Sequence, residues 1–467
     1  MHGALVPTAL LDALRAAIGA DHVATAQAVA LLDVGWNPHN LDAGIVVSPG
    51  CTQEVAAVVR LCAQYGVSLV PQAGRTGLVG GSVSQPGQIV LSLLRMHQIE
   101  PINAAERVAV VGAGCTLQAL QEAAAVLHLE PGIDLAARGS ATLGGMVSTN
   151  AGGVMAFRNG VMRHRVLGLE AVLPDGTVFQ DLTRVVKNSA GYDLKHLFIG
   201  AEGTLGVVTR VVIKLDPLPP ASATVLLGLP SVEATLDVIS RALHIDAGHL
   251  RAAEALWQGF MQLNAAALHW VDAAMPLDQP MYLLLKLGGN DSGALNAALE
   301  NLFESIVADY PQATGIIASS ARQENELWRL REDTDIVYRA HPSAPSYDVS
   351  VPLSRIPAYA AQVQAELAAY DATWRPYLFG HLADGNLHII LNQAGPLAPE
   401  RAQAVEHILY RQLQMMGGSF SAEHGVGSKR IGAMNDTTDS TKLATMAQVK
   451  ALLDPQRLMN PGKLFTA

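Results

Sequence analysis

The sequence predicts an α+β protein in which a glycine-rich ligand-binding domain precedes an α+β domain with an antiparallel sheet and a helical C-terminal segment. Three glycine-rich segments, at residues 71–82, 132–153 and 200–209, each lie beside a run of β-forming residues. A cluster of prolines at residues 217–220 then marks a boundary. Beyond it, the apolar runs ATVLLGL and MYLLLKLGG are each followed by a long alanine-rich stretch, as in strands covered by helices. We therefore predict domains at residues 1–220 and 221–410 and a helical segment at 411–467.

Size and composition narrow the class of protein. At 467 residues the chain is too long for one ordinary core, which favours two domains. The net charge of -10 argues against nucleic acid as a partner, because phosphate binding needs clustered lysine and arginine. The sequence lacks the run of about 18 apolar residues that a transmembrane helix needs. Residues 1–23 predict an amphipathic helix and not a signal peptide, and the three cysteines match no disulfide framework or cluster spacing, which favours a cytoplasmic protein.

The first domain is expected to alternate strands and helices around its glycine-rich segments. Residues 43–50 predict a strand that ends in a Pro-Gly turn, and Thr52 is expected to cap the helix that follows. A second strand at residues 66–72 leads into the first glycine-rich segment, and residues 166–180 predict a β-hairpin with its turn at residues 174–176. Neither a P-loop nor a complete GxGxxG pattern occurs, so a nicotinamide dinucleotide is not the favoured ligand.

The segment GIDLAARGSATLGGMVSTNAGG, residues 132–153, carries the strongest indication of ligand binding. It has few side chains that can pack, so its glycines are expected to serve tight turns or close approach to a ligand. Its serine, threonine and asparagine residues add donors for an anionic or heteroaromatic group. A long surface loop is the alternative for this segment alone, but the similar segments on either side favour a shared ligand site.

Two histidine-containing motifs are candidates for a metal site. GHLADGNLH places His381 and His388 seven residues apart across a turn, so a hairpin can bring both imidazoles to one side. AEHGVGSKR places Glu423 beside His424 in a loop flanked by glycine. Two histidines and a carboxylate with an open coordination position form a recognised catalytic metal set, and an adjacent histidine can take a proton. Hydrogen-bonded core histidines are the alternative, which the joint pattern disfavours.

Taken together, these motifs resemble one family of flavoproteins. The segments PQAGRTGLVGGS, GSATLGGMVSTNAGG and GAEGTLGVVT are similar to the FAD-binding (PCMH-type) domain of the vanillyl-alcohol oxidase superfamily. The motifs GHLADGNLH and EHGVGSKR, with NPGKLF, resemble its D-2-hydroxy acid dehydrogenase branch, and the resemblance extends over about residues 49–465. It implies a two-part FAD-binding domain, a substrate domain with an antiparallel sheet, and a C-terminal helical segment that carries the Glu-His motif.

The resemblance also implies which residues contact FAD. The first segment would give backbone N–H groups to the pyrophosphate, the second would line the adenosine, ribityl and isoalloxazine parts, and the third would hold the adenine end. Covalent members often carry a flavin-linking histidine in the first segment, where this chain has Arg75, so we expect FAD to be bound non-covalently. The implied FAD contacts are Pro71, Ala73, Gly74, Arg75, Thr76, Gly77, Gly80, Gly81, Ser82, Pro131, Gly139, Ser140, Thr142, Gly144, Gly145, Ser148, Asn150, Ala151, Gly153, Glu202, Gly203, Leu205, Val207 and Asn460.

For the chemistry, the resemblance implies a dehydrogenase that uses a divalent metal. His381, His388 and Glu423 would be the metal ligands, with zinc favoured and manganese nearly as suitable. The metal would polarise the substrate hydroxyl, His424 would remove its proton, and the α-hydrogen would leave as hydride to flavin N5. The flavin would be reoxidised by an external acceptor, either a quinone, an electron-transfer flavoprotein or a cytochrome, since the sequence shows no second redox centre. A homodimer is compatible with these expectations.

The substrate is less closely defined by the resemblance. Arg331 matches the arginine that pairs with the substrate carboxylate in the 2-hydroxyglutarate group, and a solvated surface charge is the alternative for it. That group has threonine where this chain has Asp335, lysine where it has Ser346 and asparagine where it has Ile390. We therefore expect D-lactate or a longer D-2-hydroxy monocarboxylate near Arg331, Asp335 and Ser346. The alternatives are a D-2-hydroxyglutarate dehydrogenase, an oxygen-using oxidase, the flavin subunit of a glycolate oxidase, a non-catalytic flavoprotein and a metal hydrolase without flavin.

Overall fold

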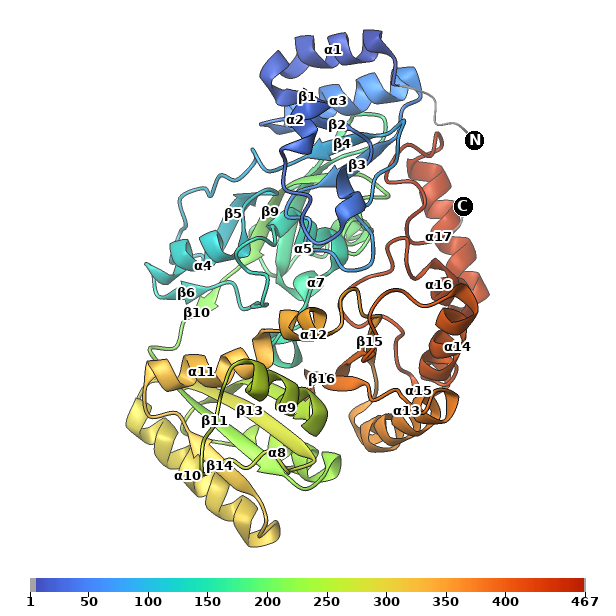
Figure 1. Ribbon diagram of the computed structural model, residues 1–467. Helices are drawn as coiled ribbons and strands as arrows, with labels where there is room; N and C mark the ends of the chain where they lie inside the picture. The colour runs from blue at the N-terminus through green and yellow to red at the C-terminus, as the bar shows by residue number, and fades with distance from the viewer. Residues whose placement is uncertain (1–5, 466–467) are drawn as a thin grey trace. The chain divides into compact units, whose positions relative to one another are not determined.

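The computed structural model describes residues 6–465, which form two compact units (Figure 1). The first unit comprises the chain up to Gly153, residues 159–218 and the residues from Glu423 onward, and the second comprises residues 154–158 and 219–422. We predicted boundaries near residues 220 and 410, whereas the units change over after Leu218 and after Ala422. The Glu-His motif is therefore part of the first unit. Within residues 6–465, no helix is both long and apolar enough to cross a lipid bilayer.

Two four-stranded sheets form the framework of the first unit. In the sheet ordered β1-β2-β4-β3, the strands β2, β4 and β3 run parallel and β1 is an antiparallel edge. In the sheet ordered β5-β9-β7-β8, all neighbours are antiparallel, and β6 pairs separately with β10. The strands are β1 Val23–Thr25, β2 Ile45–Val47, β3 Leu69–Gln72, β4 Ile89–Ser92, β5 Val108–Gly112, β6 Leu129–Glu130, β7 Val166–Val172, β8 Val178–Asp181, β9 Val207–Lys214 and β10 Asp216–Pro217. The predicted strands at residues 43–50 and 66–72 and the predicted hairpin at 166–180 are confirmed as β2, β3 and the β7–β8 pair.

Four helices of the first unit cover these sheets with an apolar face. Leu10 and Leu14 of α1 and Val55 of α3 are fully buried in a core shared with the first sheet, and Leu117 of α4 and Leu143 of α5 are buried against the second. The helices are α1 Thr8–Ile18, η1 Ala20–His22, α2 Gln27–Ala30, η2 Pro38–Leu41, α3 Thr52–Tyr65, α4 Leu117–Ala125, α5 Leu143–Thr149, α7 Met162–Arg165, η3 Leu194–Leu197, α16 Ile431–Thr437 and α17 Ser440–Leu453. The predicted N-terminal amphipathic helix corresponds to α1, and residues 1–5 of the predicted range lie outside the described residues.

The expectation that Thr52 caps a helix is wrong. Helix α3 begins at Thr52 itself, and its N-cap is Cys51, whose side chain makes no capping hydrogen bond. The hydroxyl of Thr52 instead donates to Oε1 of the buried Glu170 over 2.5 Å. The helix start is supported by Glu54, whose carboxylate accepts the N–H of Gly50 over 2.7 Å. Because the hydroxyl of Thr52 donates to the buried carboxylate of Glu170 on strand β7, it does not cap the helix.

The second unit is built on one seven-stranded antiparallel sheet with the order β14-β11-β13-β12-β16-β17-β15. The two apolar runs that predicted strands are its adjacent strands β11 and β13. Strand bounds are β11 Ala221–Leu229, β12 His249–Trp257, β13 Met281–Gly289, β14 Thr314–Ile317, β15 Ser346–Ser350, β16 Tyr377–His381 and β17 Asn386–Ile390. The predicted α+β class, with an antiparallel sheet in the second unit and a helical C-terminal part, is confirmed.

Helices cover this sheet and place the candidate substrate residues. One face carries an apolar cluster in which Phe260 of α9, Leu330 of α11 and Val337 of α12 pack with Phe379 and Ile390 of the sheet. Helices α8 and α10 pack against β11 and β13. The helices are α8 Val232–Ala242, α9 Gln258–Ala267, α10 Ser292–Asp309, α11 Ala321–Glu332, α12 Asp335–Ala340, η4 Leu353–Arg355, α13 Ile356–Tyr370, α14 Pro399–Tyr410 and α15 Leu413–Met416, and the short α6, Ala156–Asn159, lies where the chain returns to the first unit.

Candidate functional site

The three glycine-rich segments meet at one pocket in the first unit. Its wall combines the loop after β3, the segment that contains α5 and the loop before β9 with the loop that begins at Glu423. The residues expected at FAD that line this pocket are Pro71, Ala73, Gly74, Arg75, Thr76, Gly77, Gly81, Ser82, Thr142, Gly144, Gly145, Ser148, Ala151, Gly153, Glu202, Gly203, Val207 and Asn460. The other six expected contacts, Gly80, Pro131, Gly139, Ser140, Asn150 and Leu205, are not part of its lining.

The pocket also has lining residues beyond the expected FAD contacts. Glu423 and His424, expected at the metal, form part of the same wall. All of the further residues except Leu93 lie within the three glycine-rich segments, so the sequence indicated the segments but not these individual side chains. The additional lining residues are Gln72, Leu78, Val79, Leu93, Leu135, Ala137, Ala141, Met146, Thr149, Gly152, Gly206 and Val208.

Glycine is required where the first two segments touch. A Cβ on Gly74 would lie 2.0 Å from the carbonyl oxygen of Ser140, so no side chain fits there. Gly153 has a φ of +108°, and a Cβ on it would lie 2.0 Å from the carbonyl oxygen of Asp134. The glycines thus allow backbone to approach backbone at the pocket wall.

Buried polar atoms at the pocket wall fit a polar ligand. Oγ1 of Thr142 and Oδ1 of Asn460 are buried and have no hydrogen-bond partner within residues 6–465. Nδ2 of Asn460 donates to the carbonyls of Gly81 and Glu202 over 3.0 and 2.7 Å, which fixes the amide oxygen in place. Because buried polar atoms are nearly always hydrogen-bonded, these two indicate that a ligand with donors and acceptors completes the wall. The dinucleotide FAD meets this requirement.

Glu202 holds the loop that carries the Glu-His motif. Its carboxylate accepts the N–H groups of Val426 and Gly427 over 2.7 and 2.8 Å, one on each oxygen. Burial raises the pKa of Glu202, while these N–H groups and the charges of Arg430 and Lys463 oppose the rise. The resemblance placed this residue at the adenine end of FAD. Its carboxylate in the structure joins the third glycine-rich segment to the loop that carries the Glu-His motif.

Arg75 has a structural role in the first segment. Its Nε donates to Oε1 of Gln72 and its Nη1 donates to the carbonyl of Asp33, each over 2.7 Å. Burial lowers the pKa of Arg75, and the charge of Asp33 opposes this. The side chain therefore connects the loop to the rest of the unit.

Within the first unit, Glu423 is fixed to the second glycine-rich segment. The N–H of Gly153 donates to Oε1 of Glu423 over 2.7 Å. His424 follows it directly and lines the same pocket. A carboxylate and an imidazole therefore stand at the wall of the candidate flavin pocket.

In the second unit, a hairpin brings His381 and His388 together. His381 is the last residue of β16 and His388 lies in β17, and their ring centroids are 5.4 Å apart with an interplanar angle of 84°. The turn between them passes through Gly385, which has a φ of +83°. Both histidines are buried, with 7% and 8% of their surface exposed. The side-by-side arrangement expected from the seven-residue spacing is thus present within this unit.

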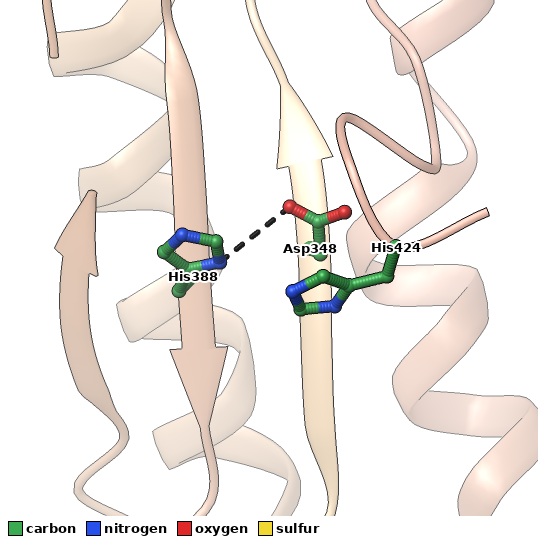
Figure 2. A group of neighbouring side chains, drawn as sticks. All are labelled: Asp348, His388 and His424. Carbon is green, nitrogen blue, oxygen red and sulfur yellow. Dashed lines mark ion pairs between the residues drawn. The ribbon is translucent and has the colours of Figure 1, made fainter. Parts of the chain in front are cut away.

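Each histidine faces a buried carboxylate that the sequence did not indicate. Nδ1 of His381 lies 2.7 Å from Oε1 of Glu254. Figure 2 shows His388 turned toward Asp348, and its Nδ1 lies 3.5 Å from Oδ1 of that residue. Asp348 Oδ1 also accepts from Nδ2 of Asn386 over 2.7 Å, and Oδ2 accepts the N–H of Ala422 over 3.1 Å. A single acidic residue in an apolar strand was the only available signal for either carboxylate.

The residues expected at the substrate also lie in the second unit. Arg331 is buried and is not the surface charge that was the alternative. Its Nη2 lies 2.8 Å from Oε2 of Glu254, and its guanidinium stacks on Phe379 at 4.8 Å. Asp335 is exposed at the start of α12, and Ser346 is partly buried at the start of β15. Glu254 therefore connects the candidate substrate arginine to a candidate metal ligand.

Comparisons with known proteins identify a family for both parts of the chain. Residues 43–181 match the family model of an FAD binding domain, and residues 218–464 match that of the C-terminal domain of FAD linked oxidases. The chain is 38% identical to a D-2-hydroxyglutarate dehydrogenase of Xanthomonas citri pv. viticola, over 92% of this chain and 90% of that protein. It is 35% identical to the mitochondrial D-2-hydroxyglutarate dehydrogenase of Bos taurus, over 90% and 76%. The solved 4-ethylphenol oxidase from Gulosibacter chungangensis shares the fold, with a TM-score of 0.72, 19% identity and coverage of 98% and 96%.

Proposed function

The chain belongs to the family of FAD-linked oxidases and is a flavin-dependent oxidoreductase, and from this premise we propose that it oxidises a D-2-hydroxy acid to the 2-oxo acid. The observation that carries the proposal is the pocket of the first unit, where the glycine-rich segments form one wall with Glu423 and His424. A flavin pocket without a proton-accepting group would suit a non-catalytic flavoprotein. An imidazole at the wall supports a dehydrogenase instead.

Different groups at the pocket have different roles in the proposed reaction. When bound, FAD supplies the acceptor for the hydride that leaves the α-carbon, and a divalent metal supplies the charge that lowers the pKa of the substrate hydroxyl. His424 takes the hydroxyl proton, and Glu202 holds its loop at Val426 and Gly427. The N–H groups of the glycine-rich segments bind FAD non-covalently.

His381, His388 and Glu423 are the proposed metal ligands, with zinc favoured and manganese second. The buried, adjacent imidazoles of the second unit support this assignment, since a carboxylate on Nδ1 is the usual partner of a metal-binding histidine. Chain connectivity also supports it. The N–H of Ala422 is bonded to Asp348, the partner of His388, and Glu423 is the next residue along the chain.

The first substrate to test is D-2-hydroxyglutarate. The named relatives support it, and so does Arg331, whose buried Nε has no hydrogen-bond partner in the described part of the chain. A guanidinium with an unused donor suits a substrate carboxylate. D-lactate or a longer D-2-hydroxy monocarboxylate is the second candidate, favoured by Asp335 and Ser346, where the 2-hydroxyglutarate group has threonine and lysine. An external acceptor, such as a quinone, an electron-transfer flavoprotein or a cytochrome, would reoxidise the flavin.

An anaerobic reduction experiment tests this function. The purified protein should show flavin absorption bands that bleach with D-2-hydroxyglutarate or D-lactate and persist with L-lactate. His424→Ala should keep the flavin but slow bleaching by at least about 100-fold, as expected on removal of a general base. His97→Ala, which changes an exposed histidine of the same unit, is the matched control and should behave as wild type. A flavin that none of the D-acids reduces, or full bleaching in His424→Ala, would overturn the proposal.

A further inference from the structure

The register of the antiparallel sheet sets a carboxylate opposite each candidate metal-binding histidine. In the β12–β16 pair Glu254 lies directly across from His381, and in the β15–β17 pair Asp348 lies directly across from His388. Directly opposed residues point to the same face of a sheet. Both carboxylates have 0% of their surface exposed. Burying two acidic groups is costly, so each is expected to serve a partner.

A carboxylate opposite an imidazole determines which nitrogen carries the proton. Oε1 of Glu254 can only accept, so Nδ1 of His381, at 2.7 Å, carries the hydrogen. Nε2 of the neutral ring then presents a lone pair, which is the form that binds a metal. Oδ1 of Asp348 lies 3.5 Å from Nδ1 of His388, which is ion-pair distance, so its negative charge favours a hydrogen on that nitrogen without a short hydrogen bond. His381 is thereby held in the ligating tautomer by a hydrogen bond, and the charge of Asp348 favours the same tautomer of His388.

We propose that Glu254 and Asp348 are positioning residues that select the Nε2-ligating tautomer of His381 and His388, and that Arg331 fixes the orientation of Glu254. The proposal rests on the metal site of the proposed function. It adds that the affinity for the metal depends on two residues that do not contact it. It also links the arginine proposed for substrate to the metal through one carboxylate.

The positive charge of Arg331 determines which way the amide of a glutamine at position 254 would face. Nη2 of Arg331 forms an ion pair with Oε2 of Glu254 over 2.8 Å, although Oε2 accepts no hydrogen bond of good geometry within residues 6–465. In Glu254→Gln, the amide oxygen would face this donor, and the amide NH2 would therefore face Nδ1 of His381. Nδ1 would then have to accept, so the hydrogen would move to Nε2 and the ring could no longer bind a metal through that atom.

The test is the zinc affinity of the purified, FAD-loaded protein, measured by competition with a chromophoric chelator, together with zinc content after dialysis. Glu254→Gln should bind zinc about 10–100-fold more weakly, the usual loss when an outer-shell partner of a ligand is removed. Asp348→Asn should weaken binding in the same direction. Glu324→Gln is the matched control, because Glu324 makes a 2.8 Å ion pair with Lys286 in the same unit and should bind zinc as wild type.

A double-variant cycle distinguishes tautomer selection from a direct effect of side-chain charge on zinc affinity. Arg331→Met in the Glu254→Gln background lets the amide turn its oxygen to Nδ1–H, so zinc affinity should recover most of the loss. Arg331→Met alone should change zinc affinity much less than Glu254→Gln does, because either oxygen of the Glu254 carboxylate can accept from Nδ1–H of His381. If charge alone mattered, Arg331→Met would strengthen binding equally in both backgrounds.

The outcomes are distinguishable from failure of the proposed function. Wild-type zinc affinity in Glu254→Gln, or equal effects of Arg331→Met in both backgrounds, would overturn the inference while leaving the metal site intact. A wild-type protein that binds no zinc and no manganese would overturn both. Thermal unfolding of each variant shows whether it is folded. If Glu254→Gln unfolds, Asp348→Asn carries the test, and unaltered zinc affinity there would equally overturn the inference.

Discussion

The N–H of Gly153 donates a hydrogen bond to Oε1 of Glu423 over 2.7 Å, although 270 residues separate the two in sequence. This bond joins the end of the longest glycine-rich segment to the first residue of the Glu-His loop. Glu202 holds the same loop from its other side at Val426 and Gly427. The candidate base and the flavin pocket are therefore parts of one hydrogen-bonded assembly in the first unit.

Replacing Glu202 by glutamine should disturb this assembly. An amide keeps the shape but offers one acceptor, so an NH2 group would face the N–H of Val426 or Gly427. An unmatched buried donor costs about 1–3 kcal/mol, and we expect stability to fall by that amount and kcat to fall more than KM changes. Glu170→Gln is the control, since the amide oxygen can keep both bonds from Thr52 and Thr209, and the amide of Gln180 at the other oxygen can turn to accept. Thermal unfolding and steady-state kinetics check this, and unchanged values for Glu202→Gln would contradict it.

Gly74→Ala should damage FAD binding. The new Cβ would lie 2.0 Å from the carbonyl oxygen of Ser140, so the first two glycine-rich segments would have to separate. We expect protein purified with much less FAD and a stability loss of at least about 1–3 kcal/mol from overpacking. Gly432→Ala on α16, where a Cβ meets nothing within 4 Å, should keep its flavin and match or exceed wild-type stability. The flavin-to-protein absorbance ratio is the measurement, and full flavin content in Gly74→Ala would refute the prediction.

The three cysteines should differ sharply in reactivity. Burial raises the pKa of Cys62 to about 12 and that of Cys115 to about 11, while Cys51 is exposed. The thiolate is the reactive form. Because pH 8 lies well below the pKa of both buried thiols, both stay protonated. A disulfide exchange reagent should therefore modify one thiol per native chain and three in guanidinium chloride. Rapid reaction of two or more thiols in the native protein would count against this.

The substrate preference should respond to two residues of the second unit. Asp335→Thr with Ser346→Lys removes one negative charge and adds one positive charge. The ratio of kcat/KM for D-2-hydroxyglutarate to that for D-lactate should rise about tenfold, because one charge-assisted hydrogen bond contributes about 1.5–3 kcal/mol. Glu326→Gln, which removes a charge of the same sign from α11, should leave the ratio unchanged. An unaltered ratio in the double variant would exclude both positions from substrate selection.

Local sequence features predicted the parts of the site that depend on backbone chemistry. Glycine-rich segments as far apart as residues 71–82 and 200–209 were expected to share one ligand, and most of their predicted residues line one pocket. The spacing of His381 and His388 predicted a shared side of a hairpin, and the rings are neighbours. The shared pocket and the neighbouring rings agree with these expectations because turns and hairpins are determined by nearby residues, whereas the FAD contacts themselves stay a prediction. The metal ligation by these histidines and Glu423 stays a prediction.

The carboxylates could not be predicted, since nothing local identifies their partners. Glu254 lies 127 residues before His381, and only the register of β12 against β16 sets them opposite each other. The predicted capping role of Thr52 was wrong for the same reason, because its hydroxyl donates to Glu170 on β7. Strand order and register arise from packing of the whole unit, which a single sequence does not reveal.

The first unit is built from three separate stretches of the chain, so it is completed only near the end of synthesis. Strand β3 is flanked by the segment around Met459, since Leu69 donates to the carbonyl of Leu458 and accepts the N–H of Asn460. The glycine-rich loops leave the ribosome early, but the residues that close their pocket are made only after the entire second unit. Flavin capture must therefore wait until translation has passed Asn460. A chain that stops after Ala422 would carry both sheets of the first unit and no complete cofactor site, so flavin loading distinguishes finished chains from interrupted ones.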